Sequence, residues 1–161
     1  MAADIFLKID GIKGESKDDK HKDEIELLAW SWAESQTGSA SRGGGMGSGK
    51  VEMHDMTFTK HVDKATPKLI SACAKGEHIP KAELAMRKAG GEQKEYLKIE
   101  LDDVMVSNYS TSGTGGGDAP TENISLTFGK ITVEYFEQDN KGTMTSAGKA
   151  GWDVKANKAV A

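Results

Sequence analysis

The chain has 161 residues, of which 37% are hydrophobic and 29% are charged, and its net charge is −4. This length suits one domain spanning residues 1–161, and the acidic balance with scattered lysines excludes a nucleic-acid-binding footprint. No window approaches 18 apolar residues, so membrane insertion is excluded as well. The first residues lack the features of a secretory signal peptide. We therefore expect a protein that is made and folded in the cytosol. If it leaves the cell, a machine that takes folded cargo must export it.

Alternation of apolar and polar residues with a period of two dominates the chain and predicts strands. Ile5, Leu7 and Ile9 mark the first strand, residues 24–34 the second and residues 51–60 the third. Later strands are expected over residues 82–86, 97–106 and 124–135. The final stretch, residues 148–161, is polar apart from Trp152 and is expected at the surface.

The alternation slips twice in the late strands. Leu101 and Val104 are three positions apart, and so are Phe128 and Ile131. Because successive side chains in a strand point to opposite faces, we expect a β-bulge at each slip. Two long, bent strands favour a closed or nearly closed barrel over a flat sheet.

One helix is predicted after the third strand. Thr66 is expected to cap it, Pro67 suits its first turn and Gly76 suits its end. Leu69, Ile70, Cys73 and Ala74 form an apolar stripe at helical spacing. We expect this helix to pack over one face or end of the strands.

Two long loops rich in glycine and serine, residues 36–49 and 110–120, interrupt the strands. Structureless loops of this length in a compact domain are usually functional or disordered. Residues Gly44 to Lys50 nearly match a phosphate-binding loop, but Val51 replaces the required hydroxyl residue and opens a strand pattern rather than a helix. A nucleotide site is therefore disfavoured.

Other catalytic or metal-binding patterns are also missing from the sequence. His54 and His61 are seven residues apart, which places them on opposite faces of a strand, and a zinc site needs three or four convergent ligands. The sequence also has no Gly-x-Ser-x-Gly pattern, which would mark an activated serine nucleophile. We therefore expect no enzyme activity, no cofactor and no metal, and we interpret the chain as a binding or assembly protein.

Several segments, in this order, resemble the haemolysin-coregulated protein (Hcp) family of bacterial type VI secretion. They are the opening Asp4 to Ser16, the run Ile25 to Trp32 with the glycine-rich loop after it, His61 to Leu69, Glu122 to Ile131 with Tyr135, and Gly151 to Asp153. The resemblance covers the chain from Ala3 to about Val160.

The resemblance implies a mainly β fold: a β-barrel of two packed antiparallel sheets with one flanking α-helix, similar to phage tail-tube proteins. It also implies a structural subunit whose hexameric rings stack into the type VI secretion inner tube and are exported. Sheath, spike and effector proteins would be its partners, with effectors carried in the channel. The family's extended loop corresponds to residues 36–50, where Arg42, Met46 and Lys50 are the candidate ring-contact residues. A monomeric β-barrel that binds a small molecule at its mouth remains the alternative.

Overall fold

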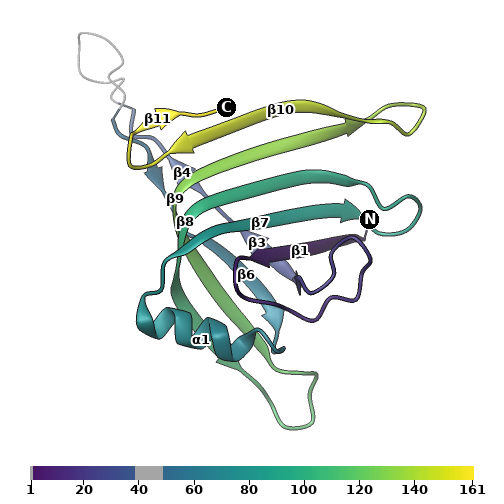
Figure 1. Cartoon of the computed structure of the whole chain (residues 1–161), viewed down its shortest axis with the longest axis vertical. Coiled ribbons are helices and arrows are strands. Elements are labelled where there is room, and N and C mark those ends of the chain that lie inside the picture. Colours follow the sequence, from purple (N-terminus) through teal and green to yellow (C-terminus); the bar gives the residue numbers. More distant parts are fainter. Residues whose placement is uncertain (1, 39–48) are drawn as a thin grey trace.

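The computed structural model describes residues 2–38 and 49–161, and strands make up most of it (Figure 1). One helix, α1 (Thr66–Lys75), lies between β6 and β7. The strands, in chain order, are β1 (Ala3–Ile9), β2 (Ile25–Glu26), β3 (Ala29–Ser31), β4 (Glu34–Ser35), β5 (Glu52–Met53), β6 (Met56–His61), β7 (Ile79–Lys88), β8 (Glu95–Ser112), β9 (Thr121–Gln138), β10 (Met144–Asp153) and β11 (Lys158–Ala159). The expectation of a mainly β chain with one helix is confirmed.

Nine of the strands within the described ranges belong to one antiparallel sheet, and β4 and β5 form a separate two-stranded ribbon. The order along the main path is β11-β10-β9-β8-β7-β1-β2. Strand β9 is the centre of the arrangement. It pairs with β8 along most of its length, with β6 over residues 121–126 and with β10 over residues 130–138.

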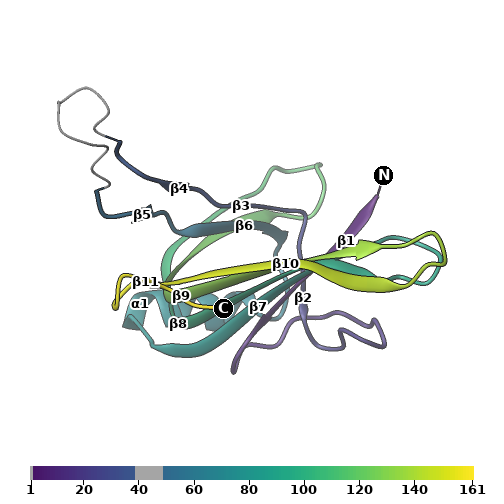
Figure 2. The ribbon, with the colours of Figure 1, turned by 90° about the horizontal axis from the view of Figure 1, so that it is seen from above.

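The expected closed barrel of two packed sheets is wrong in that form, because the sheet curves around its core without closing (Figure 2). Between the edges of β1 and β6 lie residues 24–34, which were expected to form one strand and instead contain the separate strands β2 and β3. Strand β2 pairs with β1, whereas β3 pairs with β6. Between them, the Leu27 amide donates to the Ile5 carbonyl and the Leu28 amide to the Thr59 carbonyl. The chain thus changes partners midway and breaks the strand.

The two slips in the apolar pattern lie opposite each other and do not change the register. Leu101 pairs with Ile131, and Val104 pairs with Phe128, at the same offset. Asp103 has a positive φ of 53° and lies beside Gly129, where an added Cβ would come within 3.1 Å of the Asp103 Cβ. Both strands therefore switch faces together, and no bulge shifts the register here. The register shift lies between Val106 and Asn108.

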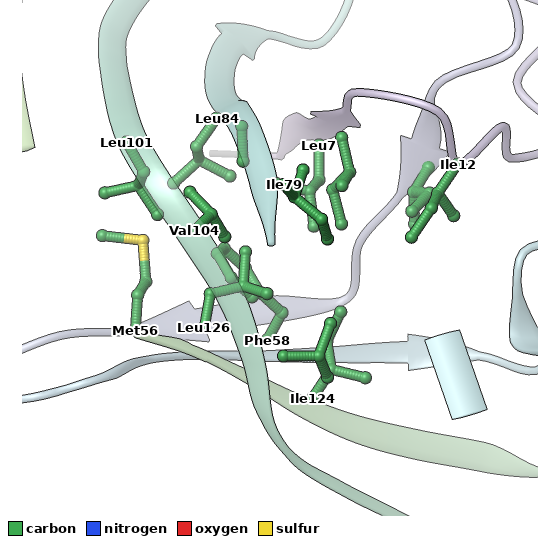
Figure 3. Close-up of a cluster of buried hydrophobic side chains, with 14 of the residues drawn as sticks. Leu7, Ile12, Met56, Phe58, Ile79, Leu84, Leu101, Val104, Ile124 and Leu126 are labelled. Atoms are coloured by element: carbon green, nitrogen blue, oxygen red, sulfur yellow. The ribbon is translucent and has the colours of Figure 1, made fainter. Parts of the chain in front are cut away.

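Apolar side chains from β1, β6, β7, β8 and β9 meet in one core (Figure 3). Met56, Phe58, Ile124 and Leu126 are completely buried where β6 crosses to β9. Helix α1 covers one end of this core with Leu69 and Ala72. Its N-cap is Ala65, not Thr66 as expected, and Gly76 ends it in the left-handed conformation.

The C-terminal stretch lies at the surface as expected, with no residue of 148–161 fully buried, but much of it also forms strands. Strand β10 covers part of residues 148–161 and pairs with β9, and β11 folds back onto it at Trp152 and Asp153. Trp152 is partly buried against the core. Gly151 allows this return, because an added Cβ would lie 2.6 Å from the Val160 carbonyl oxygen.

Candidate functional site

Lys50, one of the candidate ring-contact residues, lies on a segment that we call the arm, whose described residues are 34–38 and 49–53. Strands β4 and β5 form its stem, with Glu34 opposite Met53. The Trp32 indole donates to the His54 carbonyl at 3.0 Å and fixes the base of the stem. Figures 1 and 2 show β4 and β5 away from the main sheet.

Of the three predicted contact residues, Lys50 is the one that lies in the described part of the chain. Lys50 is exposed at the far end of the stem, and Arg42 and Met46 lie in 39–48, outside the described residues. The short strand β5, rather than a helix, follows Lys50 and Val51. A phosphate-binding loop would open a helix at this point, so the geometry disfavours a nucleotide site.

A second candidate surface is the outer face of the ladder β3-β6-β9-β8. Side-chain hydrogen bonds cross this face from Thr57 to Ser125 at 3.0 Å and from Thr59 to Asn123 at 2.7 Å. None of its outward positions carries an Asp, Glu, Lys or Arg, although these residues make up 29% of the chain. The outward residues are Ala29, Ser31, Thr57, Thr59, His61, Asn108, Ser110, Ser112, Thr121, Asn123 and Ser125, followed by the pair Met105 and Thr127. The face is therefore hydrophilic without being charged.

The same ladder ends in two open strand edges. Strand β3 pairs with β6 alone in the described part of the chain. On the other side, β7 pairs with β8 only as far as Val104, so residues 105–112 of β8 have β9 as their single neighbouring strand there. Unpaired strand edges present rows of backbone donors and acceptors and are natural sites for association.

A buried ionic cluster, which the sequence analysis missed, supports the polar face from behind. Lys60 on β6 and Glu122 on β9 are both completely buried and form an ion pair. Glu122 also accepts hydrogen bonds from Thr66 at 2.9 Å and from Tyr109 at 2.5 Å. Lys60 contacts Asp63 at 2.9 Å. The cluster thereby ties the start of helix α1 to both strands.

The ionisation of Glu122 follows from these contacts. Burial is the largest influence and opposes ionisation, but the hydrogen bonds from Lys60, Tyr109 and Thr66 together outweigh it. The pKa of Glu122 therefore lies below its ordinary value. Burial and the neighbouring Glu122 carboxylate in turn raise the pKa of Tyr109. Glu122 is therefore ionised at neutral pH, and the cluster has a structural role.

A stack of side chains holds the loop of residues 10–24 against the sheet. The His21 ring lies on Phe6, with centroids 4.2 Å apart, and the Arg87 guanidinium lies 4.8 Å from the centroid of the Phe6 ring. Nδ1 of His21 hydrogen-bonds Glu24 at 2.9 Å. Nε2 lies 2.7 Å from Glu95, but outside hydrogen-bond geometry. Arg87 binds Asp4 and Asp18, and its hydrogen bond lowers the pKa of Asp18 to about 2.

Neither a metal site nor a membrane-spanning helix is found among the described residues. Across residues 2–38 and 49–161, no three His, Cys, Asp or Glu side chains gather in a way that could hold a metal ion. The helix in the same residues is too short and too polar to cross a membrane. The features that stand out are surfaces and edges, which suit assembly.

Comparison with known proteins agrees with an assembly role. The family model described as "Type VI secretion system effector, Hcp" matches residues 6–135. Protein hcp1 of Pseudomonas aeruginosa is 51% identical over 159 residues, which cover 98% of each chain. A solved type six secretion system protein is 36% identical and superposes with a TM-score of 0.93, over 99% of this chain and 100% of that one. Hcp1 from Salmonella typhimurium is 42% identical, with a TM-score of 0.78 over 99% and 100% of the two chains. The chain therefore belongs to the Hcp family of type VI secretion, whose members are structural, secreted tube proteins and not enzymes.

Proposed function

We propose that this chain, as one tail-tube-like domain over residues 1–161, is the subunit of a type VI secretion inner tube. Six copies close into a ring, rings stack into a tube, and the tube is exported with sheath and spike proteins as partners. The subunit is made in the bacterial cytoplasm and leaves through the type VI machine. Membership of the Hcp family supports this proposal.

The observation that carries the proposal is the four-stranded ladder β3-β6-β9-β8 with its two open edges. A ring requires two different surfaces on each subunit that fit each other and close by rotation. The two edges lie on opposite sides of the ladder and meet this requirement. Joining them between copies would give a continuous wall whose exposed face is the uncharged polar face.

The uncharged polar face also supports the proposed carriage of effectors in the channel. A wall of hydroxyl and amide groups offers hydrogen bonds to many partners without favouring one sign of charge. The small-molecule alternative needs a closed barrel with an open mouth. It loses support here, because the sheet is not closed and core side chains such as Phe58 and Leu126 fill its interior.

Light scattering after size-exclusion chromatography tests the ring. Six copies of a 17.2 kDa chain give about 103 kDa, and we expect a peak at that mass with a central hole visible in electron micrographs. A species that stays at 17.2 kDa at the highest attainable concentration would contradict the proposal.

A further inference from the structure

The loop of residues 10–24 connects β1 to β2, and His21 is buried where this loop meets the sheet. The His21 side chain is 7% exposed, and its ring stacks on Phe6 of β1. Its two ring nitrogens lie beside carboxylates from two different elements, Glu24 on the loop and Glu95 on β8. We call the contact of His21 with these two carboxylates the histidine clamp.

The geometry of the histidine clamp calls for a proton on each ring nitrogen. Nδ1 hydrogen-bonds Glu24 at 2.9 Å, and Nε2 lies 2.7 Å from Glu95. A neutral imidazole has a single N–H, so in either tautomer one of the carboxylates would face a ring lone pair. Nε2 is buried and has no hydrogen-bond partner within the described residues, so water does not relieve that contact. An imidazolium, with an N–H on both nitrogens, suits both carboxylates.

The other charges around His21 come from several elements and are of both signs. Arg87 of β7 lies 4.8 Å from the centroid of the Phe6 ring and opposes a second cation there. Asp18 on the loop is close enough for the charge of His21 to act on it, and it also pairs with Arg87. A cleft of about 230 Å³ beside His21 is lined by further charged groups, namely Lys8, Lys20, Glu83, Lys98 and Glu100. The two carboxylates within 3 Å of the ring nitrogens are the charges in direct contact with the ring.

The loop that His21 holds also forms one wall of a larger cleft, of about 520 Å³. Glu15, Lys17 and Asp18 of the loop line this cleft together with Asp4 of β1 and Arg87 of β7. The position of the loop on the sheet therefore sets the shape of the cleft.

We propose that the histidine clamp is a pH-sensitive fastening: protonated His21 binds Glu24 and Glu95 together and holds residues 10–24 on the sheet, and loss of that proton releases the loop. In an opened loop the histidine meets water, where it releases its proton at about pH 6.5. Above that pH the closed loop binds one proton more than the open loop, so its closure weakens as the pH rises. Below that pH the stabilisation is fully present, as long as the two carboxylates stay ionised.

Hydrogen exchange of the loop amides measures the clamp. The Gly14 amide donates to the Asp23 carbonyl at 2.8 Å and the Ser16 amide to the Glu24 carbonyl at 3.0 Å, so both amides exchange when the loop opens. Their protection factors are corrected for the intrinsic effect of pH on exchange. We expect these factors to be constant just below about pH 6.5 and to fall above it, by up to about tenfold per pH unit, which is the slope of one released proton.

Three variants separate the clamp from ordinary packing. His21→Gln keeps a polar side chain that does not titrate, so protection should be lower below about pH 6.5 and independent of pH. Glu95→Gln places an amide, which can donate to the neutral ring, beside Nε2 and should reduce the slope while the loop stays closed. The matched control, His78→Gln, removes a histidine from an exposed pair with Asp103, 3.1 Å apart, and should leave protection and slope as in the parent.

The parent chain alone can reject the proposal. Protection factors that stay constant from about pH 6 to about pH 8.5 would overturn the clamp. A slope that persists in His21→Gln would overturn it as well, because another group would then release the proton. If His21→Gln does not fold, Glu95→Gln decides, since an unchanged slope in that variant would show that the proton is not shared with Glu95.

Discussion

At the scale of single residues, the interior contains two full charges that alternation alone could have located. Lys60 follows Met56 and Phe58 on the inward positions of β6, and Glu122 precedes Ile124 and Leu126 on those of β9. The same period that identifies the core therefore places both charges inside. Lys60 and Glu122 are 62 positions apart in the sequence. Only the folded structure therefore shows that they form a pair.

Removing one partner of this pair should be costly. Lys60→Met leaves Glu122 buried without its cation, and we expect the free energy of unfolding to fall by about 3–5 kcal/mol. The double variant Lys60→Met/Glu122→Leu removes both charges and should recover a large part of that loss. Urea unfolding measures both. A single variant as stable as the parent would show that water reaches the pair.

A second residue, Asp18, makes stability depend on pH. Its hydrogen bond to Arg87 lowers its pKa from 3.8 to about 2. A lowered pKa means that the stabilisation is present above the unfolded value of 3.8 and is lost as the pH falls through about 2. We expect Asp18→Asn to lower the urea midpoint relative to the parent by a constant amount around neutral pH. Near pH 2 the variant and the parent should have the same midpoint. A difference that persists at that pH would assign the effect to another group.

At the scale of elements, the sequence predicts some strands more closely than others. Ile5, Leu7 and Ile9 recur at every second position, as do Ala82, Leu84 and Met86, and each set lies in a single strand. Residues 24–34 carry apolar side chains on both faces, and there the chain divides between two partners. Strand β10 was missed because most of its side chains are small, polar and exposed, so no apolar pattern marks it. Its position depends on backbone pairing with β9.

Two glycines of β10 provide a matched test of this packing. Gly151→Ala places a Cβ 2.6 Å from the Val160 carbonyl oxygen and 3.0 Å from that of Ile131, whereas Gly148 has no atom within 4 Å of its Cβ position. We expect Gly151→Ala to lower the free energy of unfolding by about 1–3 kcal/mol and Gly148→Ala to change it little. Equal effects in thermal unfolding would mean that β11 does not pack against β10 in solution.

At the scale of the whole molecule, the arm is separable from the core. Glu34, Ser35 and Glu52 of its stem are exposed, and Met53 is partly buried against the core, whose buried residues come from other segments. Two-stranded ribbons are at best marginally stable alone. A short, mostly exposed stem of this kind therefore suits a contact with another copy.

Deletion of residues 38–49 tests this separation. The sheet should keep its thermal unfolding midpoint, because no core residue is removed. Rings of about 103 kDa should form while their stacking weakens. Light scattering measures ring formation, and sedimentation measures the stacking of rings. A deleted chain that stacks as well as the parent would show that residues 38–49 take no part in ring stacking.

Local sequence patterns were enough to predict the mainly β character and the helix with Pro67 and Gly76 at its ends. They also predicted a strand rather than a nucleotide-binding helix after Lys50. Each depends on side-chain period or backbone preference within a few residues. The division of residues 24–34, the shared bend at Asp103 and Gly129, and the Lys60–Glu122 pair depend on strands that are distant in sequence. The cleft lined by Asp4, Asp18 and Arg87 likewise combines β1, the loop of residues 10–24 and β7. Pairing and burial between remote segments decide such features, because the free energy that selects them arises only when those segments meet.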